Sequence, residues 1–415
     1  MPVITESKQM TKAKDSSTSV GAKATNGRHV CMIAYTMYDF DGRVRREAET
    51  LASSGFHVRC LTPMRGSRPE PYAVRGVRVH ELRAFKYQGK SKPVYFASYL
   101  WFLLASSLAC LKLLFKGELD VVHAHNLPDF LVFAGLVPRV FGRKVVLDVH
   151  DSVPETFATK FSPASTLWRA MCFEEKVSAL LAHKVICVNH PQRDVLVSRG
   201  IPSSKTFISM NMPDPTIFDL ASLPSRSIDD SSFNLVYHGT MSVRLGVDLV
   251  IRAVALSRRQ IPNVRLHLWG GGDDLKLFQA LVHELQLEST VLFGSGFALQ
   301  DLPPRLNAMH VGLVGNRQSL AGDLMLPVKL LEYVSMDIPA IVPRLKAIEH
   351  YFSDDMVLYY APGDVEACAA AIYQLYCRPE LRCAQAQRAR QFLTEHGWER
   401  QGPELVALYR GLLEP

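Results

Sequence analysis

The chain has 415 residues, of which 48% are hydrophobic and 21% are charged, a composition typical of globular proteins with sizeable buried cores. This composition excludes a disordered chain, a collagen-like repeat and a disulfide miniprotein, and the length predicts two or three domains at roughly 150 residues each. The formal net charge of +7 is unevenly spread: residues 1–120 contain 19 Lys and Arg against 10 Asp and Glu, residues 121–240 contain 11 against 11, and residues 241–415 contain 17 against 19. We therefore expect an anionic partner for the first third of the chain.

The first segment, residues 1–27, is rich in Ser, Thr and Lys and has no apolar run of the kind found in secretion signals. It predicts a disordered tail. The eight cysteines contain no Cys-x-x-Cys pair, and several of them lie in apolar runs. This pattern indicates a reducing compartment, the cytoplasm.

Strand–helix alternation fills residues 28–210, the predicted first domain. A strand over 29–35, a helix over 43–54 and a strand over 56–61 form a βαβ unit, which requires a parallel sheet. Further strands are predicted at 77–84, 120–124, 144–149 and 184–188, with helices at 127–141 and 166–182.

Residues 95–115 form a long apolar run with a single charge, Lys112, and with Lys90, Lys92 and Lys116 nearby. The run is long enough to cross a bilayer. A spanning helix would separate the two strands predicted on either side of it. We therefore favour a helix that packs on the sheet, either buried or lying on a membrane surface.

Residues 211–232 are rich in Pro, Asp and Ser and predict a linker. The alternation resumes in a second domain over 233–385, and closing helices over 386–415 could cross back to the first domain. Strands are predicted at 233–238, 264–269, 291–293, 311–314 and 340–342, with helices at 247–259, 274–285 and 327–335. The predicted fold class is therefore α/β, with two Rossmann-like parallel-sheet domains that face each other across a cleft at their strand C-terminal ends.

Two motifs of the second domain suit a phosphorylated ligand. After the strand over 233–238, Gly239 and Thr240 form a loop, and Arg244 precedes the next helix; glycine admits close backbone approach and arginine binds phosphate oxygens. Lys329 lies in the first turn of the helix that starts at Pro327, and Glu332 follows on the same face, where a carboxylate can accept hydrogen bonds from hydroxyl groups. An ordinary strand–helix turn and a solvated Lys–Glu pair are the structural alternatives.

Three histidines approach one rim of the first sheet: His123 and His125 end one predicted strand, and His150 follows another. His150 could move a proton or contact a hydroxyl group, and structural histidines are the alternative. The spacing does not favour zinc. Asp39 and Asp41 imitate a metal-binding D-x-D pair, but Asp41 directly precedes a predicted helix and suits an N-cap, so no metal is assigned.

Other signatures are missing from the sequence. There is no G-x-x-x-x-G-K-[ST], no G-x-G-x-x-G and no G-x-S-x-G motif, which argues against a P-loop, a dinucleotide site and a hydrolase nucleophile. Basic patches interleaved with aromatic residues are also missing, so we expect no nucleic acid partner.

Six segments in order, at 41–58, 119–129, 144–155, 235–249, 268–274 and 326–342, together resemble the retaining GT-B-fold glycosyltransferases of family 4. The resemblance implies a nucleotide-diphosphate-sugar donor, a UDP- or GDP-sugar, in the second domain. Its diphosphate would contact Gly239, Thr240, Arg244 and Lys329, and Glu332 matches the second glutamate of the family's E-x7-E motif, which binds ribose. The first glutamate is replaced by Leu324, so Asp323 could take its place. His150 matches the family's histidine beside the transferred sugar.

The resemblance further implies an acceptor on the first domain, at Asp39, Asp41, Arg43 and His125. We expect no metal cofactor, front-face substitution with retention of configuration, and a lipid-linked or glycan acceptor for a surface polysaccharide or glycolipid. The expected location is cytoplasmic, with peripheral contact to an anionic membrane at the inner face. A nucleotide-sugar epimerase of the same fold and a non-catalytic membrane-associated relative remain alternatives.

Overall fold

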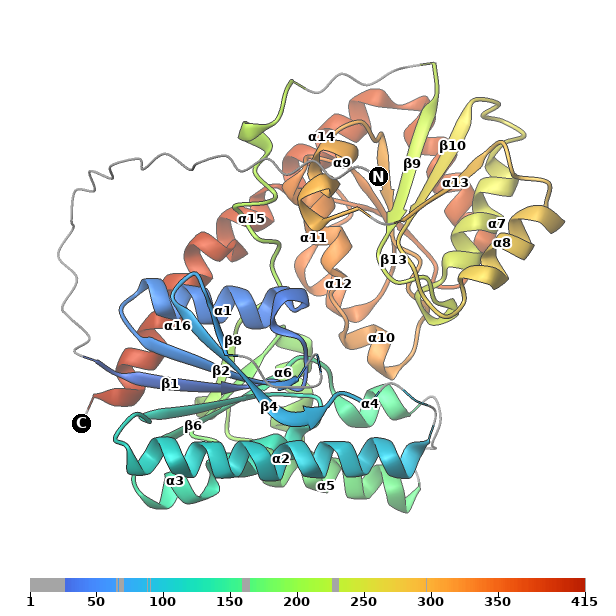
Figure 1. Ribbon diagram of the computed structural model, residues 1–415. Coiled ribbons are helices and arrows are strands. Elements are labelled where there is room, and N and C mark those ends of the chain that lie inside the picture. Colours follow the sequence, from blue (N-terminus) through green and yellow to red (C-terminus); the bar gives the residue numbers. More distant parts are fainter. Residues whose placement is uncertain are drawn as a thin grey trace, which may run out of the picture.

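The computed structural model describes residues 27–64, 66, 71–87, 89, 91–158, 165–225, 231–295 and 297–414. Apart from Gly27, the predicted tail 1–27 lies outside these residues, as do residues 226–230 of the predicted linker. Two α/β domains, each built on its own sheet, stand one above the other (Figure 1). The predicted fold class is confirmed.

The first domain contains an eight-stranded sheet in the order β3-β4-β2-β1-β5-β6-β7-β8, in which only the β3–β4 pair is antiparallel. Buried apolar runs form its centre: every residue of β5 is buried, as expected for a parallel sheet covered on both faces. The strands are β1 (His29–Ile33), β2 (His57–Met64), β3 (Tyr72–Val74), β4 (Val77–Phe85), β5 (Val121–His125), β6 (Lys144–Val149), β7 (Lys184–Cys187) and β8 (Thr206–Ile208).

Helices cover both faces of this sheet, and they are α1 (Gly42–Ser53), α2 (Lys92–Phe115), α3 (Leu136–Val140), α4 (Val153–Phe157), α5 (Thr166–Leu181) and α6 (His190–Ser198). Asp41 caps α1 by accepting a hydrogen bond from the Val44 N–H at 3.1 Å. The single helix predicted over 127–141 is wrong. A 3₁₀ stretch, Asp129–Gly135, precedes the short α3, because Pro128 and Pro138 lack the N–H groups that a continuous helix needs.

The second domain contains a six-stranded, fully parallel sheet in the order β11-β10-β9-β12-β13-β14. Its strands are β9 (Phe233–His238), β10 (Val264–Trp269), β11 (Val291–Gly294), β12 (Val311–Leu313), β13 (Ala340–Pro343) and β14 (Leu358–Tyr360). Its helices are α7 (Val247–Ser257), α8 (Leu275–Glu284), α9 (Leu302–Leu306), α10 (Leu320–Leu324), α11 (Val328–Ser335), α12 (Lys346–Tyr351), α13 (Val365–Cys377), α14 (Pro379–Ala389) and α15 (Gln391–His396).

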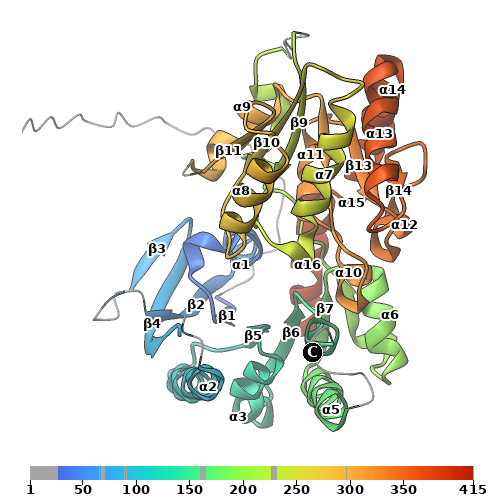
Figure 2. The ribbon, with the colours of Figure 1, turned by 90° about the vertical axis from the view of Figure 1, so that its right-hand side faces the viewer.

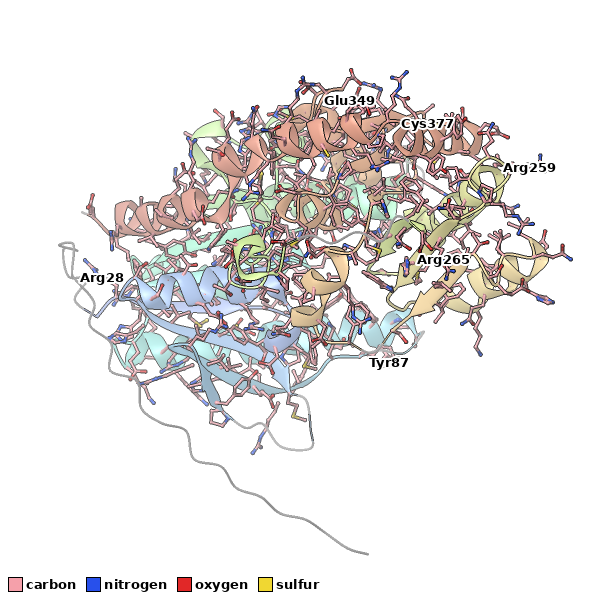
Figure 3. The ribbon with its side chains drawn as sticks, turned by 90° about the horizontal axis from the view of Figure 1, so that it is seen from above. Arg28, Tyr87, Arg259, Arg265, Glu349 and Cys377 are labelled. Atoms are coloured by element: carbon pink, nitrogen blue, oxygen red, sulfur yellow. The ribbon has the colours of Figure 1, made fainter. Side chains whose placement is uncertain are left out.

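The last helix, α16 (Trp398–Leu413), lies on the first domain rather than the second (Figure 1). Its Leu405 and Tyr409 are buried in the same core as Val30 and Val44. Arg28, labelled in Figure 3, donates a hydrogen bond to the Leu413 carbonyl at 3.4 Å. The chain therefore passes between the domains twice, once near residue 210 and once before α16.

Candidate functional site at the domain interface

Three adjoining cavities follow the C-terminal ends of the two sheets. One of about 220 Å³ lies in the first domain, one of about 190 Å³ lies between the domains, and one of about 550 Å³ lies in the second domain. His150 lines both the first and the interdomain cavity. Pro327 and Val328 line both the interdomain and the second cavity. The three cavities therefore adjoin one another in a row from the first domain to the second.

The second-domain cavity is built on two backbone loops that touch. Gly239 follows β9, and Gly270 follows β10 with a φ of +138°. A Cβ atom on Gly270 would lie 2.0 Å from the Gly239 carbonyl oxygen, so only glycine allows this approach. Gly239 and Thr240, the predicted diphosphate contacts, both line the cavity.

Lys329 and Glu332 face the same cavity from α11. The Lys329 ammonium lies 3.8 Å from the centre of the Tyr237 ring. Burial lowers the pKa of Lys329 to about 7, although the Glu332 charge works against this shift. Burial likewise raises the pKa of Glu332 to about 7, opposed by Lys329. Both groups therefore lack solvation that a polar ligand could supply.

His238 is a neighbour of this pair that the sequence did not single out. Its Nε2 lies 3.3 Å from Glu332 Oε2, and its pKa falls to about 3 because the ring is buried beside the Lys329 charge. The His238 ring is therefore neutral at physiological pH. Trp269 and Phe297, also unassigned from the sequence, supply an apolar wall, with ring centres 6.0 Å apart and ring planes at 88° to each other.

Two predicted donor contacts do not line the second-domain cavity. Arg244 is exposed in the turn before α7, although its charge contributes to lowering the pKa of Lys329. Asp323 is half-buried on α10 and lines none of the three cavities. Leu324 lines the interdomain cavity, and its carbonyl accepts a hydrogen bond from the Asn189 side chain at 2.8 Å. The role of Asp323 in place of the missing glutamate stays a prediction.

The first-domain cavity includes two of the four predicted acceptor-side residues, Asp41 and His125. Asp39 does not line it. Arg43 does not line it either, since the side chain is only 3% exposed and its guanidinium is paired with Asp148. This placement corrects the expectation that Arg43 contacts an acceptor: the cation is needed to neutralise a buried carboxylate.

Aromatic residues that were not predicted complete the first-domain cavity. Tyr95 and Tyr99 lie one turn apart on α2, and Tyr35 and Lys86 follow β1 and β4. Tyr87, labelled in Figure 3, donates its backbone N–H to the Tyr35 hydroxyl at 3.1 Å. The i,i+4 spacing of the two α2 tyrosines was the sequence signal that could have revealed this wall.

Behind His125 the structure gathers four side chains that could ligate a metal ion: Glu47, His123, His125 and Asp148, with ligand atoms within 4.8 Å of one another. All four are buried. The guanidinium of Arg43 bridges the two carboxylates, at 3.2 Å from Glu47 and 2.7 Å from Asp148. A divalent cation would add two further charges to this buried group, which is electrostatically costly.

The outer helices of the first domain expose an apolar face. Of the 22 large apolar side chains that are exposed among the described residues, 15 lie on or next to α2, α3 and α5. Figures 1 and 2 show α2, α3 and α5 side by side, on the side of the first domain away from the second. In the described part of the chain, α2 is the helix long and apolar enough to cross a membrane, by length and composition alone. Its exposed face shows that α2 is not the buried helix considered above.

Two facing parallel α/β domains, with adjoining cavities at their strand C-terminal ends, are the arrangement of a GT-B-fold glycosyltransferase. Residues 43–212 match the family model described as Glycosyltransferase Family 4, and residues 232–378 match Glycosyl transferases group 1. The chain belongs to the family 4 glycosyltransferases and is a transferase enzyme, which confirms the predicted resemblance.

Two curated relatives support this membership. The chain is 27% identical over 175 residues to the GDP-mannose-dependent alpha-(1-6)-phosphatidylinositol monomannoside mannosyltransferase of Mycolicibacterium smegmatis, covering 41% of this chain and 46% of the relative, which is less than half its length. It is 24% identical over 396 residues to the D-inositol 3-phosphate glycosyltransferase of Corynebacterium urealyticum, covering 89% of each.

Solved structures agree on the fold. Sucrose-phosphate synthase from Thermosynechococcus elongatus superimposes with a TM-score of 0.75 at 20% identity, over 93% of this chain and 99% of that one. WaaG, a glycosyltransferase involved in lipopolysaccharide biosynthesis, superimposes with a TM-score of 0.66 at 20% identity, over 91% of this chain and 99% of that one. Anabaena HepE in complex with UDP superimposes with a TM-score of 0.68 at 13% identity, over 92% of this chain and 99% of that one.

Proposed function

We propose that this glycosyltransferase moves a sugar from a nucleotide-diphosphate-sugar in the second-domain cavity to an acceptor in the first-domain cavity. The observation that carries the proposal is the row of three adjoining cavities, with His150 shared by the first two and Pro327 shared by the last two. The sugar to be transferred would occupy the interdomain cavity. Two substrates bound at either end would meet there without crossing solvent, which favours transfer over hydrolysis.

In this arrangement the apolar wall of Trp269 and Phe297 packs against the nucleobase, and Glu332 accepts hydrogen bonds from the ribose hydroxyls. The diphosphate lies against Gly239 and Thr240, with Lys329 as the neutralising cation. As the sugar–phosphate bond breaks, charge grows on the leaving diphosphate, where fixed N–H dipoles and an ammonium stabilise it. We propose that no metal is needed, and expect full activity after exhaustive chelation.

We propose retention of configuration by front-face substitution. The bond between the anomeric carbon and the leaving phosphate oxygen breaks, the bond to the acceptor oxygen forms on the same face, and the acceptor proton passes to the leaving phosphate. Asp151 is the carboxylate that lines the interdomain cavity. Mass spectrometry of enzyme quenched during turnover should therefore show no sugar on Asp151, and a glycosylated Asp151 would instead establish a double-displacement mechanism.

We propose further that the acceptor is lipid-linked and that the enzyme is cytoplasmic, resting on the inner face of the membrane through the apolar face of α2, α3 and α5. Lys112 and Lys116, at the end of α2, are exposed beside it and suit anionic headgroups. The named acceptor of the Mycolicibacterium relative, a phosphatidylinositol mannoside, is of this class.

Vesicle sedimentation tests the membrane contact with a matched pair of variants. Leu104 and Leu108 are each 51% exposed on α2, and Leu277 is 54% exposed on α8 of the second domain. Leu104→Gln/Leu108→Gln should weaken binding to phosphatidylglycerol-containing vesicles by about tenfold or more, since two leucines would no longer be buried. Leu277→Gln should bind like the wild type. Equal binding by all three proteins would remove this part of the proposal.

Thermal shift with UDP-, GDP- and dTDP-sugars tests the donor class, because a ligand that binds only the folded state raises the melting temperature. The matching base should stabilise the protein, and no response to any of the three would contradict the donor cavity. Nucleotide release that requires an added acceptor distinguishes transfer from epimerisation.

A further inference from the structure

A buried carboxylate lies directly beneath His150. Asp148 belongs to β6, is fully buried, and accepts a hydrogen bond on Oδ2 from His150 Nε2 at 2.8 Å. The His150 side chain, in contrast, is 21% exposed and lines two cavities. Its Nε2 is thus directed into the protein, and Nδ1 makes no hydrogen bond to any residue in the described part of the chain.

Arg43 fixes Asp148 in place. Its Nε donates to Oδ2 at 2.8 Å and its Nη2 donates to Oδ1 at 2.7 Å, so that the guanidinium grips both carboxylate oxygens. His125 Nδ1 lies 3.0 Å from Oδ2 as well. A carboxylate held by a two-pronged guanidinium cannot rotate freely, and His150 Nε2–H therefore donates its hydrogen bond to an acceptor in a fixed position.

The same guanidinium reaches the segment that connects the domains. Arg43 Nη1 donates to the Ser209 carbonyl at 2.7 Å, and the Ser209 hydroxyl donates to Glu47 at 3.0 Å. Ser209 immediately follows β8, the last strand of the first domain. One side chain thus ties the carboxylate beneath His150 to the point where the chain leaves for the donor-binding domain.

The charges around His150 favour its protonated form. Burial lowers the pKa of His150, but the charge and hydrogen bond of Asp148 outweigh it, and the pKa lies above the usual 6.5. Burial raises the pKa of Asp148, yet Arg43 and His150 hold it well below its usual value. The titratable and charged groups that face His150 come from its own loop and strand, from β5 and from α1: Asp148, Asp151, His123, His125, Arg43, Glu47 and Asp41.

We propose that Asp148, held by Arg43, is a positioning residue that orients the His150 ring with Nε2–H on the carboxylate and Nδ1–H directed at the transferred sugar. This inference rests on the proposed place of His150 beside that sugar. The sugar hydroxyl would accept the Nδ1–H hydrogen bond from an imidazolium, which is stronger than a bond from a neutral ring. Through its hydrogen bond to Ser209, Arg43 would also keep the His150 ring at a fixed position relative to the second domain.

Steady-state kinetics of Asp148→Asn test the proposal, with Asp120→Asn as the matched control. Asp120 also pairs with a histidine and an arginine, His29 and Arg143, but at the opposite end of the same sheet. Asp148→Asn should lower kcat by about tenfold or more, because the His150 ring loses the carboxylate that fixes its tautomer and orientation, with a smaller change in KM. The fall of kcat/KM at high pH should move to lower pH, since an uncharged partner no longer favours the imidazolium. Asp120→Asn should change neither.

Two comparisons separate the possible failures. If His150→Gln retains wild-type kcat, the proposed role of His150 itself is wrong. If His150→Gln loses activity while Asp148→Asn keeps both its kcat and its pH profile, the positioning role is wrong and the proposed function stands. In the double variant, Asp148→Asn should lower kcat little below the value of His150→Gln alone, because the carboxylate acts through the ring.

An NMR titration of the wild-type protein gives an answer even if Asp148→Asn does not fold. The His150 ring signal, assigned by its loss in His150→Gln, should titrate above pH 6.5. Its neutral form should carry the proton on Nε2. A midpoint below 6.5, or a neutral ring with the proton on Nδ1, would overturn the proposal.

Discussion

We predict that donor binding depends on pH, because the Lys329 ammonium is buried in the second-domain cavity. Its pKa is about 7 in the empty cavity, because the ammonium is buried with too little compensation. A bound diphosphate supplies two negative charges and raises this pKa, so binding must draw a proton whenever the lysine is neutral. The protonated fraction of Lys329 falls from about nine-tenths at pH 6 to about one-tenth at pH 8, so this lysine alone should lower the affinity about tenfold over this range, and ionisation of Glu332 offsets part of that loss.

Titration calorimetry with an intact nucleotide-sugar tests this prediction, since its diphosphate carries the same charge across the range. Lys329→Met should weaken binding at pH 6 by about 1.5–3 kcal/mol, the contribution of a charge-assisted hydrogen bond, or roughly 10- to 150-fold in Kd. Lys329→Arg stays charged and should remove the loss of affinity with rising pH, leaving only the opposite contribution of Glu332, whose own pKa of about 7 makes it a stronger hydroxyl acceptor at higher pH. A wild-type Kd that is equal at pH 6 and pH 8, or a tenfold change that persists in Lys329→Arg, would refute the reasoning.

Three further substitutions have expected outcomes. Glu332→Ala should weaken donor binding by about 1.5–3 kcal/mol through the lost ribose contacts. It should also shift the pH dependence of Kd to lower pH, because the Glu332 charge raises the pKa of Lys329. Calorimetry measures both effects. Arg244→Ala should raise Kd by at most about fivefold, since exposed charge pairs contribute about 1 kcal/mol or less and Arg244 is exposed. Gly246→Ala should destabilise the second domain by about 1–3 kcal/mol in urea unfolding, because Gly246 has a φ of +66° and a Cβ there would lie 1.8 Å from the Gly315 carbonyl oxygen.

The predictions from the sequence were most accurate for strands that are buried on both faces of their sheet. The bounds of β9 and β10 agree with the prediction to the residue, because central parallel strands are continuous apolar runs that end sharply at polar loops. Short elements such as β3, β8 and α4 escaped prediction, since three to five residues carry too little periodicity. The α2 run gave a helix but not its environment: its residues are apolar all round, so the pattern contained no polar face that would have shown which side packs on the sheet.

The donor side of the site was more predictable than the acceptor side for a similar reason. Lys329 and Glu332 are three residues apart on one helix, and helical geometry alone places them together. Arg43 and Asp148 are 105 residues apart, and nothing local to either residue indicates that they pair. The sequence therefore predicted a ligand contact for Arg43, whereas the tertiary structure pairs it with the buried Asp148.

The apolar face and the first-domain cavity together constrain how the enzyme would sit on a membrane. Tyr95 and Tyr99, near the start of α2, line the proposed acceptor cavity, while Leu104 and Leu108 of the same helix project outward. An α2 that rests on lipid would hold the cavity mouth within a few helical turns of the headgroups, each turn rising about 5.4 Å. The second domain, on the other side of the first, would stay in water with its nucleotide-sugar. In this orientation the exposed Lys112 and Lys116 at the end of α2 would face anionic lipid.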